Sequence, residues 1–162
     1  MHVTFQNRAL GLFLLCLVAG PAVCATSCSL AVGNLAFGAY DVFNPVSLDS
    51  SASLVITCSR VGGPPGSVVS IAIGPSTSGG ITGDRRMQVP GAADFLSYNL
   101  FRDATRTSVW GNIAGVDTFV QAINVPNRGT AQVFATMFGR IFAGQDVRSG
   151  NYTDTVLVTV SP

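Results

Sequence analysis

The sequence contains no lysine and no glutamate: all nine basic residues are arginine and all eight acidic residues are aspartate. Its only histidine is His2. The chain therefore lacks the commonest general base, the lysine amine that forms Schiff bases and the glutamate of most glycosidase and metal sites. It also lacks two of the residues that usually cover helix surfaces. This composition argues against an ordinary enzyme and against a helical protein.

Catalytic and ligand-binding motifs are missing as well. A phosphate-binding P-loop requires lysine, and a serine triad requires a histidine in the folded domain. An aspartic-protease dyad would need glycine after each Asp-Thr/Ser pair. Asp49-Ser50, Asp117-Thr118 and Asp154-Thr155 all lack that glycine. We therefore expect no catalytic residue, no metal site and no cofactor.

The first 25 residues have the pattern of a secretory signal peptide that is removed on export. Arg8 supplies the positive charge, and residues 9–20 form an apolar segment that is too short for a membrane span of roughly 20 residues. Pro21 follows, and Val23-Cys24-Ala25 provides small residues at the cleavage site. A lipoprotein signal at Cys24 fits less well. The prediction is a signal peptide over 1–25 and one exported domain over 26–162, with no transmembrane segment after leader removal.

The predicted mature chain carries few charges. Arg8 leaves with the leader, so eight arginines and eight aspartates remain and the domain is formally neutral. This is about half the charge density of a usual soluble domain. No basic run occurs, which makes nucleic acid and anionic membranes poor partners. So few charges are typical of a protein that packs against other proteins.

Two cysteines remain after cleavage, Cys28 and Cys58, because Cys16 and Cys24 lie in the leader. In an oxidising compartment such a pair predicts a disulfide. A metal or redox pair is the alternative, but no His, Glu or second Cys lies nearby.

The mature segment reads as short strands separated by clusters of Gly, Pro, Asn and Ser, without a helical period. The predicted strands cover 28–32, 35–40, 54–58, 69–73, a segment entered at 85–87, 95–101, a short piece at 109–111, 132–141 and 152–160. Gly74-Pro75 is expected to end the fourth of these. Strands that recur every 10 to 15 residues indicate a β-sandwich.

Three groups of residues could be either functional or structural. Arg85-Arg86 could clamp a ligand, but a solvated strand start, with one arginine pairing Asp84 or Asp103, is the favoured interpretation. Trp110, the only tryptophan, is expected to fill the core rather than to act in adhesion. Phe37, Tyr40 and Phe43 could form a binding stripe, although Phe37 and Tyr40 fit a core and turn role better.

Several motifs, taken in order, resemble the spore coat protein U domain, the subunit fold of Csu-type (archaic) chaperone–usher pili. They are Cys28, then Phe37-Gly38-Ala39-Tyr40, Cys58, Arg86-Met87, Leu96-Ser97-Tyr98-Asn99-Leu100-Phe101 with Asp103, Trp110-Gly111, Phe138-Gly139-Arg140-Ile141 with Gln145, and residues 150–156. Phe101, Phe138 and Phe142 depart from the usual pattern. The resemblance covers nearly the whole predicted mature chain.

The resemblance implies an all-β, incomplete immunoglobulin-like β-sandwich that a donor strand completes. It implies a structural pilus subunit that serves surface adhesion and biofilm formation. Its partners would be a periplasmic pilus chaperone, an outer-membrane usher and neighbouring pilus subunits, and it would travel through the periplasm to the cell surface. By alternation alone, the donor-strand groove would be lined by Leu30, Val32, Val156, Val158 and Val160. The motif residues Phe37, Gly38, Tyr40, Tyr98, Trp110, Gly139, Tyr152 and Asp154 would serve the core and its turns.

Cleavage after Ala25 would leave two residues ahead of Cys28, whereas a donating subunit needs roughly ten. We therefore expect a subunit that accepts a strand without supplying one, placed at the tip or as a terminator. The alternative function is a secreted spore-coat or matrix protein of the same fold that does not polymerise through an usher. A periplasmic small-ligand binder is a third class, but no polar residues converge in sequence.

Overall fold

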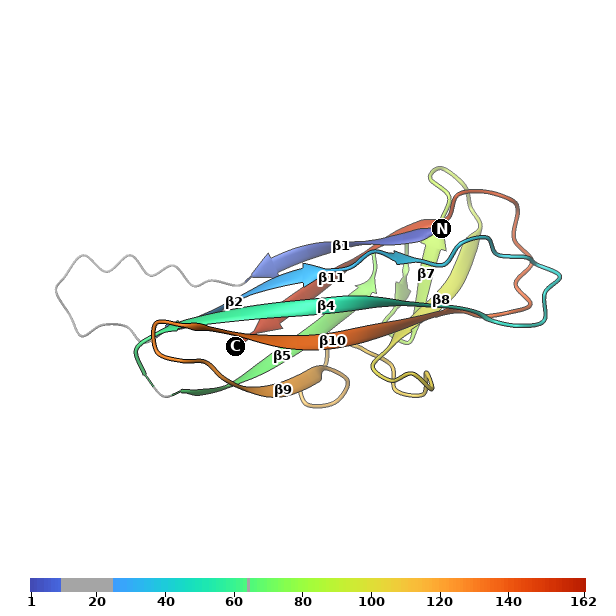
Figure 1. The fold of residues 1–162 in the computed structure, drawn as a ribbon. Coiled ribbons are helices and arrows are strands. Elements are labelled where there is room, and N and C mark those ends of the chain that lie inside the picture. The colour runs from blue at the N-terminus through green and yellow to red at the C-terminus, as the bar shows by residue number, and fades with distance from the viewer. Residues whose placement is uncertain (10–24, 64) are drawn as a thin grey trace.

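The computed structural model describes residues 1–9, 25–63 and 65–162, and within these residues it contains strands and turns but no helix. Figure 1 shows the arrangement. The strands are β1 (His2–Ala9), β2 (Ala25–Val32), β3 (Leu35–Ala36), β4 (Leu48–Val61), β5 (Gly66–Ser76), β6 (Gly80–Ile81), β7 (Asp84–Gln88), β8 (Phe95–Phe101), β9 (Phe119–Asn124), β10 (Thr130–Ile141) and β11 (Thr153–Ser161). The predicted all-β class is confirmed.

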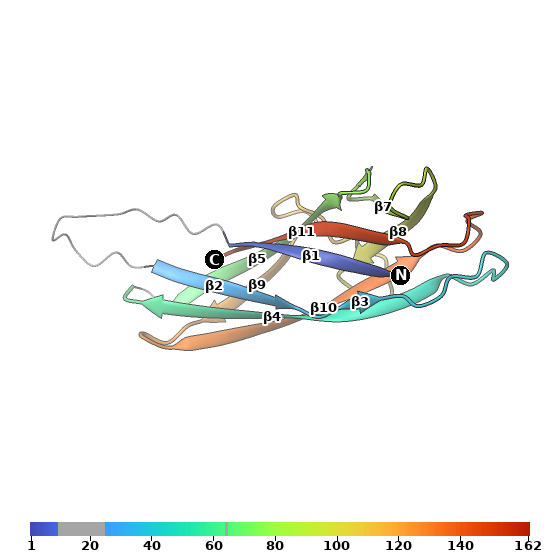
Figure 2. The ribbon, with the colours of Figure 1, turned by 90° about the horizontal axis from the view of Figure 1, so that it is seen from above.

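The strands form one curled sheet that folds back on itself as a β-sandwich. The hydrogen-bonded path runs β2-β4-β10-β8-β7-β11-β1-β3, while β5 joins β11 to β9 and β6 pairs with β7. Only one residue pair, Thr153 with Gln88, connects β7 to β11, so the sheet is narrow where it turns between its two layers. In Figures 1 and 2, β2, β4 and β10 run side by side along the length of the molecule, and β11 lies between β5 and β1.

Alternation of side chains explains the core. On β4, Leu54, Ile56 and Cys58 are fully buried, as their spacing predicts, and the residues between them are half-buried. On β11, Val156, Val158 and Val160 face the core, while Leu157 between them is exposed. Because successive side chains of a strand point to opposite faces, each layer supplies one apolar face to a shared core.

Disulfide formation between Cys28 and Cys58 is confirmed. The two residues face each other in the antiparallel pairing of β2 with β4, and their sulfurs are bonded at 2.05 Å. The bond therefore fixes the first strand after the predicted cleavage point to the centre of its layer.

Several strand boundaries differ from the prediction. The strand expected over 35–40 ends at Ala36, because Gly38 adopts a left-handed backbone with φ of 79° and turns the chain. Strand β5 does not end at Gly74-Pro75 but continues to Ser76, and the register with β11 shifts between Val156 and Val158 to accommodate it. Residues 109–111 form no strand; Val109 makes one isolated bridge with Phe101.

The predicted signal peptide contains the first strand, β1, which the sequence did not indicate as a strand. Residues 10–24, with most of the apolar segment, Pro21, Val23 and Cys24, lie outside the described residues. Removal of residues 1–25 therefore stays a prediction.

Candidate functional site: the groove between β11 and β3

One edge of β11 pairs with β5, and the other edge is occupied by β1. The β1 strand runs parallel to β11 over eight residue pairs, from His2 opposite Thr153 to Ala9 opposite Val160. At its beginning β1 also pairs with β3 in antiparallel fashion, with His2 opposite Ala36 and Val3 opposite Leu35. The N-terminal strand thus lies between β11 and β3, as Figure 2 shows from above; the position that it occupies between these two strands is called the groove.

Side chains of β1 alternate between the core and solvent. Val3 is 1% exposed, and Met1 and Phe5 are half-buried against the same core. His2, Thr4 and Gln6 are exposed. This period of two is what a strand needs in order to cover an apolar groove on one side and face water on the other.

Backbone hydrogen bonds close the groove at the end where β1 begins. The N–H of Phe37 donates to the carbonyl of Met1 at 3.2 Å, and the amino terminus of Met1 donates to the carbonyl of Gly38 at 3.4 Å. Farther along β1, a cleft of about 270 Å³ separates it from β2; Val3, Thr4 and Phe5 face Val32, Gly33 and Asn34 across it. The groove is therefore closed by pairing at β3 and open toward β2.

The five predicted groove residues lie in two places. Val156, Val158 and Val160 are on β11, at positions that the register pairs with Phe5, Asn7 and Ala9 of β1. Val32 on β2 borders the cleft beside β1. Leu30 is half-buried and packs against the core on β2, where it pairs with Ile56 of β4. Contact of these residues with a strand from another protein stays a prediction.

Leu35 was not among the predicted groove residues. It is fully buried, and its backbone pairs with Val3. Alternation could have pointed to it, because Leu35 and Phe37 flank an exposed Ala36. It was missed because its pairing with β1 depends on the tertiary fold.

The aromatic motif residues Phe37, Tyr98, Trp110 and Tyr152 are all buried, with at most 5% of their surface exposed. Trp110 fills the core, as expected, and its ring nitrogen donates to the carbonyl of Ile71 at 2.9 Å. Tyr40 is half-buried, and its hydroxyl accepts a hydrogen bond from the N–H of Gln145 at 2.9 Å. Phe43, by contrast, is 91% exposed, so these aromatic residues do not form one stripe.

A buried carboxylate anchors the start of β11. Asp154 is 4% exposed, and its Oδ2 accepts a 2.6 Å hydrogen bond from the Tyr98 hydroxyl. Its Oδ1 accepts the N–H of Ser78 at 3.2 Å. Burial and the neighbouring Asp154 charge raise the pKa of Tyr98 well above its usual value, so that the hydroxyl stays protonated and donates. The pair joins β8 to β11 at the groove end nearest β3.

Arg85 is fully buried, so the expectation of a solvated strand start is wrong for this residue. Its guanidinium donates five hydrogen bonds of 2.7–3.0 Å, to the carbonyls of Gly74, Thr82, Ile73 and Trp110 and to Oδ1 of Asn99. Burial lowers the pKa of Arg85 to about 10, which still leaves it charged at neutral pH. The expectation holds for Arg86, which is half-exposed and pairs with Asp84 at 3.0 Å.

The side-chain amide of Gln145 takes the place of a neighbouring strand beside Ser97 of β8. Its Nε2 donates to the carbonyl of Ser97 at 2.8 Å, and its Oε1 accepts the N–H of Ser97 at 2.6 Å. This amide satisfies both backbone groups of Ser97, as a paired strand would. With the bond to Tyr40, it ties the loop after β10 to the loop after β3.

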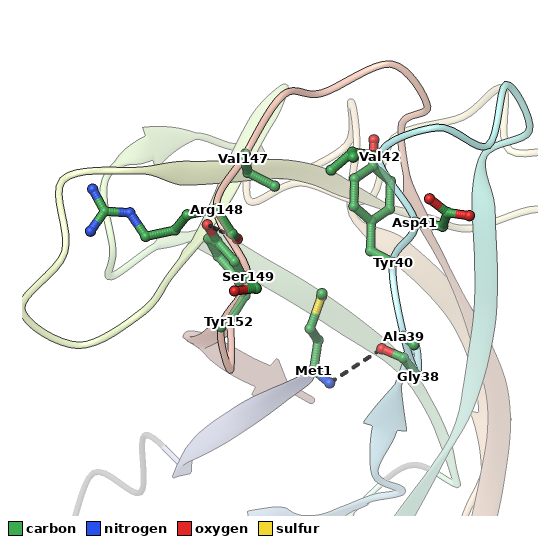
Figure 3. Close-up of a pocket in the computed structure, with 11 residues that line it drawn as sticks. Met1, Gly38, Ala39, Tyr40, Asp41, Val42, Val147, Arg148, Ser149 and Tyr152 are labelled. Carbon is green, nitrogen blue, oxygen red and sulfur yellow. Dashed lines mark hydrogen bonds between the residues drawn. The ribbon is translucent and has the colours of Figure 1, made fainter.

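A cavity of about 590 Å³ lies at the end of the groove, where β1 begins (Figure 3). Two of its polar side chains are engaged within their own loops: the Asp41 carboxylate accepts the N–H of Phe43 at 2.9 Å, and the Tyr152 hydroxyl donates to the carbonyl of Arg148 at 3.1 Å. The Arg148 guanidinium points away from Met1 and pairs with Asp94.

Among the described residues, no three or more His, Cys, Asp or Glu side chains come together as metal ligands would. In the same part of the chain, no helix has the length and apolar character to span a bilayer.

These observations define a class: a disulfide-bonded β-sandwich in which the two edges of β11 are paired with β5 and with the N-terminal strand β1. Comparison with known proteins gives the family. The chain matches the model of the Spore Coat Protein U domain over residues 14–159, and it belongs to that family. It is also similar to Protein U of Myxococcus xanthus, with 32% identity over 146 residues, 85% of this chain and 76% of the relative. The family comprises structural, exported or surface-associated proteins, and the predicted resemblance is confirmed.

Proposed function

We propose that this protein is a structural subunit of a chaperone–usher pilus that serves surface adhesion and biofilm formation. Export removes residues 1–25, and the groove between β11 and β3 then accepts a strand from another protein. A periplasmic pilus chaperone supplies that strand first, and a neighbouring pilus subunit replaces it at the outer-membrane usher. The subunit reaches the cell surface through the periplasm.

The observation that supports this proposal is the groove itself. The edge of β11 that β1 covers extends over eight residue pairs and lies beside the buried apolar core. Without a strand there, backbone N–H and C=O groups of β11 would lack partners beside an exposed apolar surface, which is an aggregation hazard. Strand addition at such an edge gives affinity through main-chain hydrogen bonds and specificity through alternate side chains.

Co-expression tests the proposal. The gene, with its leader, is expressed in the periplasm with and without a pilus-chaperone gene taken from beside it. The N-terminus of the product is sequenced, and the product is examined by size-exclusion chromatography and thermal melting. We expect a product that begins at Thr26 and is degraded or aggregated alone, but is recovered as a one-to-one complex with the chaperone.

Two matched variants locate the contact on β11. Val158→Asp places a charge on the buried face of the strand, whereas Leu157→Asp places the same charge on a side chain that is 38% exposed. We expect the first variant to lose the chaperone complex and the second to keep it. A stable, cooperatively melting monomer that begins at Thr26 and forms no complex with the chaperone would contradict the proposal.

That contrary result would favour a second function, a secreted spore-coat or matrix protein of the same fold that does not polymerise through an usher. The observation in its favour is the family itself, whose model is described as the Spore Coat Protein U domain. Both functions are structural, and they differ in whether the groove is filled by another protein.

A further inference from the structure

We propose that strand β9 is a contact between two copies of this protein, in which β9 of one copy pairs in antiparallel fashion with β9 of the other. The inference goes beyond the proposed function and does not depend on it, because β9 lies outside the groove. It adds a lateral contact that subunits of neighbouring pili, or coat proteins of the same fold, would share.

Strand β9 is at the edge of its layer. It pairs with β5 through all six of its residues, and in the described part of the chain no strand pairs with its other edge. The adjacent layer is open on the same side. Strand β10 pairs with β8 only through its last four residues, so residues 130–137 have β4 as their one partner among the described strands. A cleft of about 430 Å³ lies between β9 and this part of β10.

This open side faces away from the groove. In one layer β5 separates β9 from β11, and in the other β4 separates β10 from β2. Figure 1 shows β9 at the bottom of the molecule and β1 at the top. A strand or a chaperone that is seated in the groove therefore leaves β9 accessible.

The β9 edge lacks the features that normally keep a sheet edge from pairing. Residues 118–127 contain no charged side chain, β9 contains no proline, and its register with β5 is continuous. On the outward face Val120 is 52% exposed, and Val68 on β5 is 54% exposed. On the inward face Ile123 is buried, which fixes the strand against the core. The result is a fixed, neutral edge with apolar side chains beside it.

The charges favour a second copy as the partner. Like charges directly opposite one another destabilise a strand pair, and an uncharged strand meets its own copy without any. The domain is also formally neutral after removal of the predicted leader, with eight arginines and eight aspartates, so two copies carry no net repulsion. An antiparallel pair of identical strands has twofold symmetry, so the contact is closed and holds two copies.

Side-chain alternation restricts the register of this pair. Residues directly opposite in an antiparallel pair have their side chains on the same face of the sheet. Pairing of all six residues would place Ala122 opposite Gln121, which points to the other face. The twofold axis therefore passes beside Gln121 or Ala122. The residue at the axis lies opposite its own copy, at about 4.5–5.5 Å between Cα atoms.

Cysteine cross-linking tests the contact. The gene with its leader is expressed for export, and the product is used in the form in which it is recovered, alone or with the chaperone. Gln121→Cys and Ala122→Cys, both at exposed positions, place a thiol at the two possible axis positions. We expect one of these variants to form an intermolecular disulfide under mild oxidation, which peptide mapping locates on β9.

Val68→Cys is the matched control. Val68 lies opposite Ala122 on the neighbouring strand β5 and is exposed. In the proposed pair it is three strand spacings, about 14 Å, from its own copy, and a disulfide needs Cα atoms within about 7 Å. The reactive β9 variant should therefore cross-link at least about tenfold faster than Val68→Cys. Equal rates for all three variants, or a faster rate for Val68→Cys, would overturn the proposal.

Sedimentation equilibrium gives a second measurement. The wild-type product should associate reversibly to twice its recovered mass as the concentration rises. Ala122→Arg places like charges beside the axis and should weaken this association by about fivefold or more. Val68→Arg should leave it unchanged, because its charges are separated by more than the Debye length of about 8 Å. Equal association of the wild type and Ala122→Arg would overturn the proposal.

Other occupants of this edge give a different result. If the edge takes a strand from a different protein, the purified product keeps its recovered mass and neither β9 variant cross-links, which overturns the proposal. The outcomes also separate this inference from the proposed function. Cross-linking on β9 in a product that forms no complex with the chaperone would keep the contact and contradict the pilus role. A chaperone complex without the cross-link would do the reverse.

Discussion

The backbone of Gly139 on β10 lies directly against the ring of Phe37. A Cβ atom at position 139 would be 2.6 Å from Cζ of Phe37 and 3.0 Å from Cδ2 of Leu35, both of which are well below ordinary contact distances. Phe37 follows β3, the short strand on one side of the groove. Because Gly139 has no side chain, β3 can approach the core closely.

Gly139→Ala should therefore lower the free energy of unfolding by about 1–3 kcal/mol, the usual cost of overpacking a filled core. Thermal and urea unfolding of the purified chain measure the loss. Phe37→Leu in the same chain should recover part of it, because the leucine side chain is shorter. Gly66→Ala is the control, since no atom lies within 4 Å of its added Cβ. Equal stability of both alanine variants would contradict the close approach.

Tyr98→Phe should destabilise the protein by about 1–3 kcal/mol at neutral pH, because it removes a hydrogen bond to the buried Asp154 carboxylate. Urea unfolding of the variant and the wild type at pH 8 measures the difference.

The same pair of proteins gives a pH dependence. The pKa of Tyr98 is raised in the folded state, so the unfolded chain releases this proton first. The contribution of Tyr98 is complete below its unfolded pKa of about 10 and is lost as the pH rises toward the folded value. Wild type should therefore lose stability relative to Tyr98→Phe above pH 10. Parallel stability curves for the two proteins through the alkaline range would refute the raised pKa.

Arg85→Lys should cost about 3 kcal/mol or more, although it keeps the charge. A lysine ammonium has three donors on a single atom and cannot reach the five acceptors that the guanidinium fork satisfies, so buried carbonyls would lose their partners. Arg86→Lys is the matched control on the same strand, with an exposed ion pair worth at most about 1 kcal/mol. Similar unfolding midpoints for the two variants would show that the buried network contributes little.

The two arginines also illustrate what sequence can and cannot predict. Alternation was sufficient to place Leu54, Ile56 and Cys58 on one buried face, because that information is local. The burial of Arg85 depends on carbonyls from residues 73–74, 82 and 110, which only the tertiary fold brings together. From the sequence alone, a charged side chain is therefore expected to face solvent, even where the tertiary fold buries it and supplies its hydrogen-bond partners.

Strands β9 and β1 were not predicted from the sequence, for similar reasons. Strand β9 is an edge strand in which most residues between Phe119 and Asn124 are exposed, so it carries no apolar period. Strand β1 lies in a segment that was assigned to a leader, so its alternating residues were not considered as a strand. Its partner on β11 lies at the other end of the chain, at residues 153–160. The candidate site was therefore predicted from its β11 wall, whereas its β3 wall and its occupant required the fold.

The final prediction concerns the disulfide that pins β2 to β4. Cys28→Ala with Cys58→Ala should lower the free energy of unfolding by about 3–4 kcal/mol, the chain-entropy value for a loop closed across a sequence separation of 30. The single variant Cys58→Ala should reduce periplasmic yield further, because it leaves Cys28 as a free thiol beside an unpinned first strand. Urea unfolding of the double variant and recovery of the single variant from the periplasm measure the two effects. If the double variant unfolds at the wild-type urea concentration, β2 is held by its pairing with β4 alone and the bond is dispensable.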